Sequence, residues 1–157
     1  MTGTGAAYAR PSETGLAVLA GNLNLQPTAS GTWTNTVLEV DLPSAGTYNL
    51  DAVVRGNLSG VTPVNTWITA RLFDVTAGAV VPNTETMVYQ VGVTVSAPSS
   101  ITDGGNQGGV IATRYVTTGP RTIRLQAQRT NSVGASTVAA IHSDGTGRTT
   151  LRYARVA

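Results

Sequence analysis

The chain has 157 residues, a length that suits one domain and that buries roughly 70% of the surface of the unfolded chain. It contains no cysteine, which excludes disulfides, thiolate metal sites and cysteine catalysis. Charged residues make up 11% of the chain and the formal net charge is +2, so we expect no nucleic-acid partner. No apolar run approaches the roughly 18 residues of a membrane span, so we expect no membrane partner.

The first 31 residues are rich in Gly, Ala, Thr and Ser. We predict an extended N-terminal arm at 1–31 with one short strand, followed by a β-sandwich domain at 32–157. A frayed terminus is the alternative interpretation, because chain ends stay disordered unless contacts hold them. The apolar residues of the arm are Leu16, Val18, Leu19, Leu23 and Leu25.

The stretch from Trp33 to Gly56 predicts a β-hairpin. Apolar and polar residues alternate along 36–42 and again along 48–54, which is the period of a half-buried antiparallel strand. Pro43 presets φ for the intervening turn, and Gly46 accepts the positive φ that closes it.

The rest of the chain repeats this alternation. We predict a loop at 57–63, a bulge or close packing at Gly92, and a long polar loop at 97–109. Further strands are predicted at 65–75, 86–95, 110–117, 121–129, 136–141 and 149–156. With the hairpin this gives about eight strands and no helical periodicity, which predicts an all-β antiparallel sandwich or barrel.

No group of residues predicts catalysis, a metal ion or a cofactor. The single histidine, His142, precedes Ser143 and Asp144, but no nucleophile elbow of the form G-x-S-x-G is present. Asp103 and Asp144 stand in Gly-rich segments that each offer one carboxylate, whereas Ca²⁺ takes about six to eight oxygen ligands. We therefore expect a protein that is not an enzyme.

Three short segments resemble the C1q/TNF-like jelly rolls. Residues 43–48, P-S-A-G-T-Y, are similar to the P-x-x-G-x-Y segment of that family, 119–125 to a late turn and strand, and 151–156 to the closing strand. The resemblance spans most of residues 33–156 and implies a jelly-roll sandwich. Phe73 is the only phenylalanine, which departs from the animal members of the family.

The Thr-, Gly- and Ala-rich, cysteine-free and lysine-free composition resembles small virion proteins of tailed bacteriophages. That resemblance implies a homotrimeric knob on a particle surface, either a head decoration protein or a fibre tip. We expect a capsid decoration protein on the virion exterior, made in the host cytoplasm without a signal peptide. Its expected partners are itself and the major capsid protein or another virion protein, with the five apolar arm residues docking on the capsid. The residues expected to pair across the subunit interface are Arg124, Gln126, Gln128, Arg152 and Tyr153.

The alternative is the receptor- or glycan-binding knob of a tail fibre. Asp103, Asn106 and Gln107 in the predicted loop would then contact the ligand. Trp67, Tyr89 or Tyr115 would offer a stacking surface, although we favour packing in the core as the explanation of these aromatic residues. A fibre tip usually follows a long shaft and this chain offers only a short arm, which favours decoration.

Overall fold

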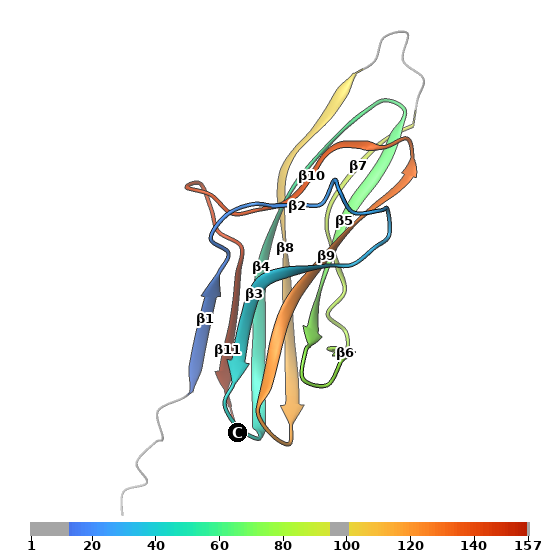
Figure 1. Cartoon of the computed structure of the whole chain (residues 1–157). Helices are drawn as coiled ribbons and strands as arrows, with labels where there is room; N and C mark the ends of the chain where they lie inside the picture. Colours follow the sequence, from blue (N-terminus) through green and yellow to red (C-terminus); the bar gives the residue numbers. More distant parts are fainter. Residues whose placement is uncertain (1–12, 95–100, 157) are drawn as a thin grey trace, which may run out of the picture.

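The computed structural model describes residues 13–94 and 101–156. All of its described elements are β-strands, arranged in two antiparallel sheets that face each other (Figure 1). The strands are β1 (Thr14–Val18), β2 (Leu23–Asn24), β3 (Thr34–Leu42), β4 (Gly46–Val61), β5 (Val64–Asp74), β6 (Ala79–Val80), β7 (Thr86–Val93), β8 (Thr102–Thr117), β9 (Arg121–Val133), β10 (Ser136–His142) and β11 (Thr150–Arg155).

One long strand organises each sheet. In the first sheet, the β4 sheet, β8 pairs with β4 along its whole length, while β11 and then β10 pair with its other edge. The short strands β1 and β2 extend this edge by pairing with β11 and β10. In the second sheet, the β5 sheet, the order is β3-β9-β5, and β6 and β7 pair with the far edge of β5. The fold is therefore an antiparallel sandwich of jelly-roll type.

The core lies between the sheets because each long strand alternates inward apolar and outward polar residues. The largest fully buried side chains include Leu38, Tyr48, Leu50, Ile68, Leu72, Ile123, Leu125 and Leu151. The predicted fold class is confirmed. The eight predicted strands correspond to β3–β5 and β7–β11. The predicted arm, for which one short strand was expected, holds two, β1 and β2, and the short strand β6 was not predicted.

Part of the predicted N-terminal arm belongs to the sandwich. Residues 14–18 pair with β11, and Leu19 and Leu25 are buried in the core. The sequence carries aliphatic residues on both faces of this segment, so a strand here packs inward and still presents Leu16 and Val18 outward. Residues 1–12 of the predicted arm lie outside the described residues.

Both predicted loops are wrong for most of the residues that the structure describes. Thr62 and Pro63 of the first loop do turn the chain between β4 and β5, and Ile101 of the second precedes β8. Residues 57–61 continue β4, and 102–109 form the first half of β8, paired with them. The glycines allow the two sheets to approach each other: a Cβ at Gly60 would lie 2.6 Å from Val64, and one at Gly109 would lie 3.3 Å from Val88 Cα. Glycine here marks close packing rather than a loop. Residues 97–100 of the second predicted loop lie outside the described part of the chain.

The irregularity predicted at Gly92 also lies elsewhere. Gly92 pairs regularly with Asn65, whereas the register shifts between Ile68 and Thr69 and leaves Val88 as the extra residue of β7. Val88 therefore points inward, and Met87 is exposed. A bulge moves the alternation by one residue, which the sequence pattern alone did not show.

Candidate interaction face on the β4 sheet

The outward side of the β4 sheet carries an exposed aliphatic surface. Val18, Thr150, Val53 and Val110 lie in register across β1, β11, β4 and β8. Leu16 lies on β1 in the neighbouring row. The side chains of Leu16 and Val110 are each 65% exposed, and those of Val18 and Val53 are 47% and 44% exposed. We call Leu16, Val18, Val53 and Val110 the apolar face.

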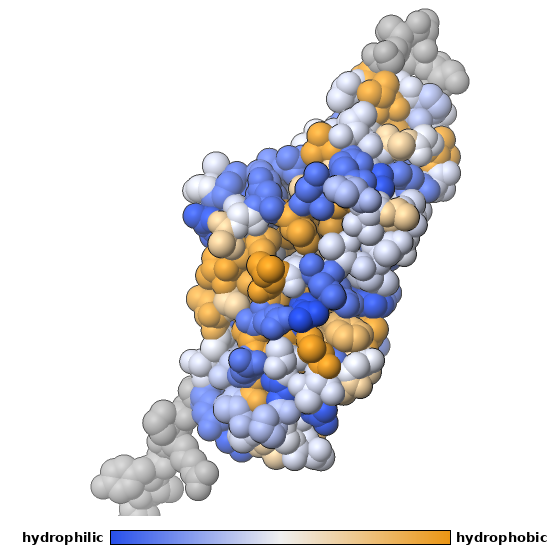
Figure 2. All heavy atoms as spheres, viewed as in Figure 1, coloured by the Kyte–Doolittle hydropathy of each residue, from blue (hydrophilic) through white to orange (hydrophobic). Residues whose placement is uncertain are grey.

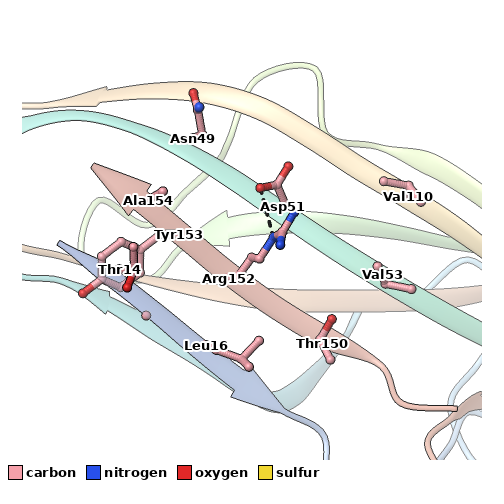
Figure 3. Close-up of a pocket in the computed structure, with 11 residues that line it drawn as sticks. Thr14, Leu16, Asn49, Asp51, Val53, Val110, Thr150, Arg152, Tyr153 and Ala154 are labelled. Carbon is pink, nitrogen blue, oxygen red and sulfur yellow. Dashed lines mark hydrogen bonds and ion pairs between the residues drawn. The ribbon is translucent and has the colours of Figure 1, made fainter. Parts of the chain in front are cut away.

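Leu16, Val53 and Val110 of the apolar face line an open depression of about 740 Å³ (Figure 3). Its lining residues come from all four strands: Thr14, Gly15, Leu16, Asn49, Asp51, Val53, Val110, Thr150, Arg152, Tyr153 and Ala154. In the view of Figure 2, hydrophobic side chains gather on the side of the molecule where β1 and β11 lie. Sites for small ligands usually add several convergent polar groups to such a surface. The charged groups here instead bond to each other.

Those charged groups are Arg152 and Asp51, on neighbouring strands. Arg152 Nε lies 3.3 Å from Asp51 Oδ2, and both side chains point outward between the aliphatic residues (Figure 3). An exposed pair of this kind is worth about 0–1 kcal/mol in the isolated chain. The pair leaves the depression without net charge.

The structure separates the five residues predicted at the subunit interface. Arg152 borders the apolar face. Tyr153 alternates with it and turns inward, where its ring packs edge-on against Tyr48 at 5.6 Å and burial raises its pKa. Arg124, Gln126 and Gln128 stand on β9, in the other sheet. The five residues therefore do not form one surface.

The outward side of the β5 sheet holds a polar network, although Val37 on β3 is also exposed there. Arg71 Nε donates to Gln126 Oε1 at 2.8 Å, and Gln126 Nε2 donates to Asn35 Oδ1 at 2.7 Å. The Arg71 guanidinium lies 3.9 Å from the centre of the Trp33 ring and pairs with Glu85. Arg124 likewise pairs with Glu39. These groups satisfy one another within the chain.

The five aliphatic residues predicted to dock on a capsid are divided in the same way. Leu16 and Val18 belong to the apolar face. Leu19 and Leu25 are buried in the core of their own chain, and Leu23 packs partly buried against that core. Leu16 and Val18 are therefore the two of the five that are exposed.

The residues of the alternative ligand site lie in β8 rather than in a loop. Asp103, Asn106 and Gln107 are exposed and pair with residues 60, 57 and 56 of β4. Asp103 Oδ1 accepts a hydrogen bond from the backbone N–H of Gly104 at 2.8 Å, where φ is +144°. This segment occupies the half of β4 and β8 beyond the apolar face.

The three aromatic residues considered for stacking are all partly buried. Tyr89 and Tyr115 pack against the core, and Trp67 lies on the outward side of β5. Tyr115 also donates to the buried carboxylate of Asp74 at 2.5 Å, which joins the two sheets. Burial and this hydrogen bond raise the pKa of Tyr115 to about 12.

The segment around His142 is a hydrogen-bonded turn. His142 Nε2 lies 3.6 Å from Asp144 Oδ2, but the Ser143 hydroxyl donates to the backbone oxygen of Leu19 at 2.5 Å. Hydrogen bonds from Thr146 and Arg55 hold the pKa of Asp144 well below its usual range. These contacts do not align a serine, an imidazole and a carboxylate for catalysis.

Within residues 13–94 and 101–156, no cluster of three or more His, Asp or Glu could hold a metal ion. In the same part of the chain, no helix is long and apolar enough to cross a membrane.

The sequence predicted the strands that carry the apolar face but not the face itself. Val53 alternates with the buried Ala52 and Val54, and Val110 precedes the buried Ile111. Aliphatic residues at outward positions of three strands could have indicated an exposed apolar surface. Their meeting in one row depends on the pairing of β1, β11, β4 and β8, which are distant in sequence.

No protein-family model matches this sequence, and no curated protein matches it. Among solved structures, the chain is similar to one from the structure of infectious bursal disease virus, Gx strain, with 13% identity and a TM-score of 0.50. The alignment covers 94% of this chain and 38% of that chain. The chain is also similar to one from the T13 particle of the same virus, with 15% identity and a TM-score of 0.45, where the alignment covers 93% of this chain and 36% of that chain. A further similarity is to Eiger TNF from S. frugiperda, with 10% identity and a TM-score of 0.43, where the alignment covers 94% of both chains. The viral likeness at 0.50 shows that this chain shares a β-sandwich fold with a protein of a virus particle.

Proposed function

We propose that this chain is a non-enzymatic structural protein of a bacteriophage virion, a head decoration protein that binds the capsid exterior as a homotrimer and stabilises the particle. The apolar face carries the proposal. Val18, Val53 and Val110 lie in one register row of the β4 sheet with Leu16 beside it, and exposed apolar surfaces on soluble proteins mark contacts with other proteins. The fold shared with a chain of a virus particle supports the proposal by analogy.

The low charge density fits this role. The formal net charge of +2 provides no basic field for genome binding. The polar groups on the outward side of the β5 sheet are bonded to one another within the chain, so they do not need a partner. The particle surface is the location that we propose.

The test mixes the purified chain with undecorated capsids and, separately, with host cells. We expect co-sedimentation with capsids and an increase in their resistance to heat. Binding to cells without binding to capsids would contradict decoration and favour the receptor- or glycan-binding knob. Because β1 is part of the sandwich, point variants are preferable to deletion of residues 1–31.

A further inference from the structure

The chain contains two Asp-Gly dipeptides, and the structure places them in different environments. Asp103-Gly104 lies at the start of β8, and Asp144-Gly145 lies in the turn between β10 and β11. In such a dipeptide the backbone nitrogen of the glycine can attack the carboxyl carbon of the aspartate, because glycine has no side chain that hinders the approach. In a folded chain the reaction depends on how close these two atoms lie and on what holds the carboxylate.

The atoms of Asp103 and Gly104 are arranged for this attack. Asp103 is exposed, and its Oδ1 accepts a hydrogen bond from the backbone N–H of Gly104 at 2.8 Å. The carboxyl carbon is one bond of about 1.2 Å from that oxygen, so it lies within about 4 Å of the nitrogen, near the roughly 3–3.5 Å of a near-attack geometry. Within residues 13–94 and 101–156, no cation or hydroxyl binds this carboxylate.

The fold itself requires the glycine at position 104. Its φ is +144°, and a Cβ there would lie 2.2 Å from the backbone oxygen of Leu58 and 2.5 Å from the Cα of Ser59. The residue that packing against β4 demands therefore also leaves the attacking nitrogen unhindered. Asp103 is the second residue of β8, and a strand end opens at a lower free energy than the strand centre. This position can reach the geometry of attack without unfolding of the sandwich.

The carboxylate of Asp144 is held instead. Its Oδ1 accepts hydrogen bonds from Arg55 Nη1 at 2.9 Å, from the Thr146 backbone N–H at 2.9 Å and from the Thr146 hydroxyl at 2.7 Å. These bonds hold the pKa of Asp144 well below its usual range. A carboxyl oxygen leaves as water only from the protonated group, so the reactive form is scarce. Backbone hydrogen bonds between Asp144 and Gly147 also fix the turn.

We propose that Asp103 is a site of spontaneous isomerisation to isoaspartate, and that its contacts protect Asp144 from the same reaction. The Gly104 nitrogen attacks Asp103 Cγ, a C–N bond forms, a C–O bond breaks, and the carboxyl oxygen leaves as water with the protons of the carboxyl group and the nitrogen. Water then opens the resulting succinimide. Opening at the backbone carbonyl breaks its bond to nitrogen and gives isoaspartate, whereas opening at the side-chain carbonyl restores aspartate. Solvent water is the only co-reactant.

The product changes the backbone of β8. Isoaspartate passes the main chain through Cβ, which adds one backbone atom at position 103 and turns the former backbone carboxyl into a side group. Asp103 pairs with Gly60, so the ladder must shift there, as it does at a bulge. Asn106 and Gln107 of the alternative ligand site follow within four residues, whereas Val110 lies farther along the strand. Isomerisation therefore alters the polar half of β8 rather than the apolar face.

The test ages the purified full chain for several weeks at about pH 5, where an ordinary aspartate is protonated in roughly a tenth of molecules. A second sample is aged in concentrated urea. Isoaspartate has the mass of aspartate, so it is counted by enzymatic methylation of isoaspartyl carboxyls and located by electron-transfer fragmentation of peptides. In the folded chain the rate at position 103 should exceed that at position 144 by at least about ten-fold. In urea the two rates should agree within about two-fold.

Two outcomes overturn the proposal. A folded chain in which position 103 reacts no faster than position 144 shows that the contact between Gly104 and Asp103 does not promote attack. The same ten-fold preference in urea shows that the neighbouring sequence, and not the fold, sets the difference. Neither outcome depends on a variant that must fold, and neither affects the proposed virion role.

Two variants test the assigned contacts in the folded state, which circular dichroism verifies. Asp103→Glu keeps the charge but requires a six-membered ring, so methylation at position 103 should fall to the background. Arg55→Gln removes the cation from Asp144, so isomerisation at position 144 should rise several-fold while that at position 103 stays unchanged. Methylation at position 103 that persists in Asp103→Glu, or an unchanged rate at position 144 in Arg55→Gln, contradicts the proposal.

Discussion

The two outward sides of the sandwich are built from the same strand alternation but differ in the side chains that they expose to water. On the β5 sheet, Arg71, Gln126 and Asn35 form a chain of hydrogen bonds. On the β4 sheet, the side chains of Val53 and Val110 are exposed to solvent, and Arg152 and Asp51 form a charged pair beside them.

The difference shows how a sheet surface is completed. Polar side chains that bond to each other need no partner, and their desolvation is already offset within the chain. Exposed aliphatic side chains gain free energy only when another surface covers them. We therefore expect substitutions on the β5 side to change the stability of the chain, and substitutions on the β4 side to change its assembly.

The largest effect is expected where the two sheets are joined. Tyr115→Phe removes the hydroxyl that donates to the buried Asp74, and hydrogen bonds to charged groups contribute about 1.5–3 kcal/mol. Urea unfolding should show a loss of that size. Tyr89→Phe, on the neighbouring β7, should change stability by less than about 0.5 kcal/mol. Equal losses in the two variants would mean that the bond to Asp74 does not hold the sheets together.

The same bond predicts a pH dependence in alkaline solution. The pKa of Tyr115 is raised from 10.0 to about 12, first by burial and then by the hydrogen bond to Asp74. The unfolded chain therefore loses this proton near pH 10 while the folded chain keeps it, so stability falls as pH rises from 10 to 12. The fall should be steeper in the wild type than in Tyr115→Phe, measured by thermal unfolding across that range. Parallel curves would contradict the assignment.

The polar side should respond next. Gln126→Leu removes the bonds to Arg71 and Asn35, with an expected loss of about 1–2 kcal/mol and no change in assembled mass. Gln128→Leu on the same side of β9 is the control and should change stability by less than about 0.5 kcal/mol. A change in assembled mass with Gln126→Leu would contradict the expectation that substitutions on the β5 side leave assembly unchanged.

The smallest effect on the isolated chain is expected at the charged pair. Arg152→Ala breaks an exposed ion pair and should lower the stability of the monomer by less than about 1 kcal/mol. In an assembly of copies the substitution leaves Asp51 without its cation. The free energy of association should therefore change by more than the free energy of unfolding of the monomer. Light scattering over a dilution series measures the dissociation constant. A large loss of monomer stability with an unchanged constant would contradict this.

The sequence predicted most of the fold because alternation is local. Leu38 and Leu50 fall on inward positions that are readable without knowing the partner strand. The errors occurred where contacts with another strand decide the outcome. Gly60 and Gly109 suggested loops, yet they occur where Val64 and Val88 from the facing sheet come close.

The candidate site was less predictable because it depends on strand order. Leu16 was identified as a contact residue from its aliphatic character, whereas Val110 became part of the same surface only through pairing of β8 with β4. Gln126 suggested an interface because it is polar and outward, but its bonds lie within the chain. The partners of an outward side chain are not encoded in its own strand.

Hydroxyl-radical footprinting of the wild type compares the two sides in one experiment. Leu16 and Val110 are each 65% exposed in the single chain, and Val37 is 85% exposed. If copies cover the apolar face, Val37 should be modified rapidly while Leu16 and Val110 are modified several-fold more slowly than their exposure implies. The protection should disappear on dilution. Modification of all three residues in proportion to their exposure at every concentration would contradict the account.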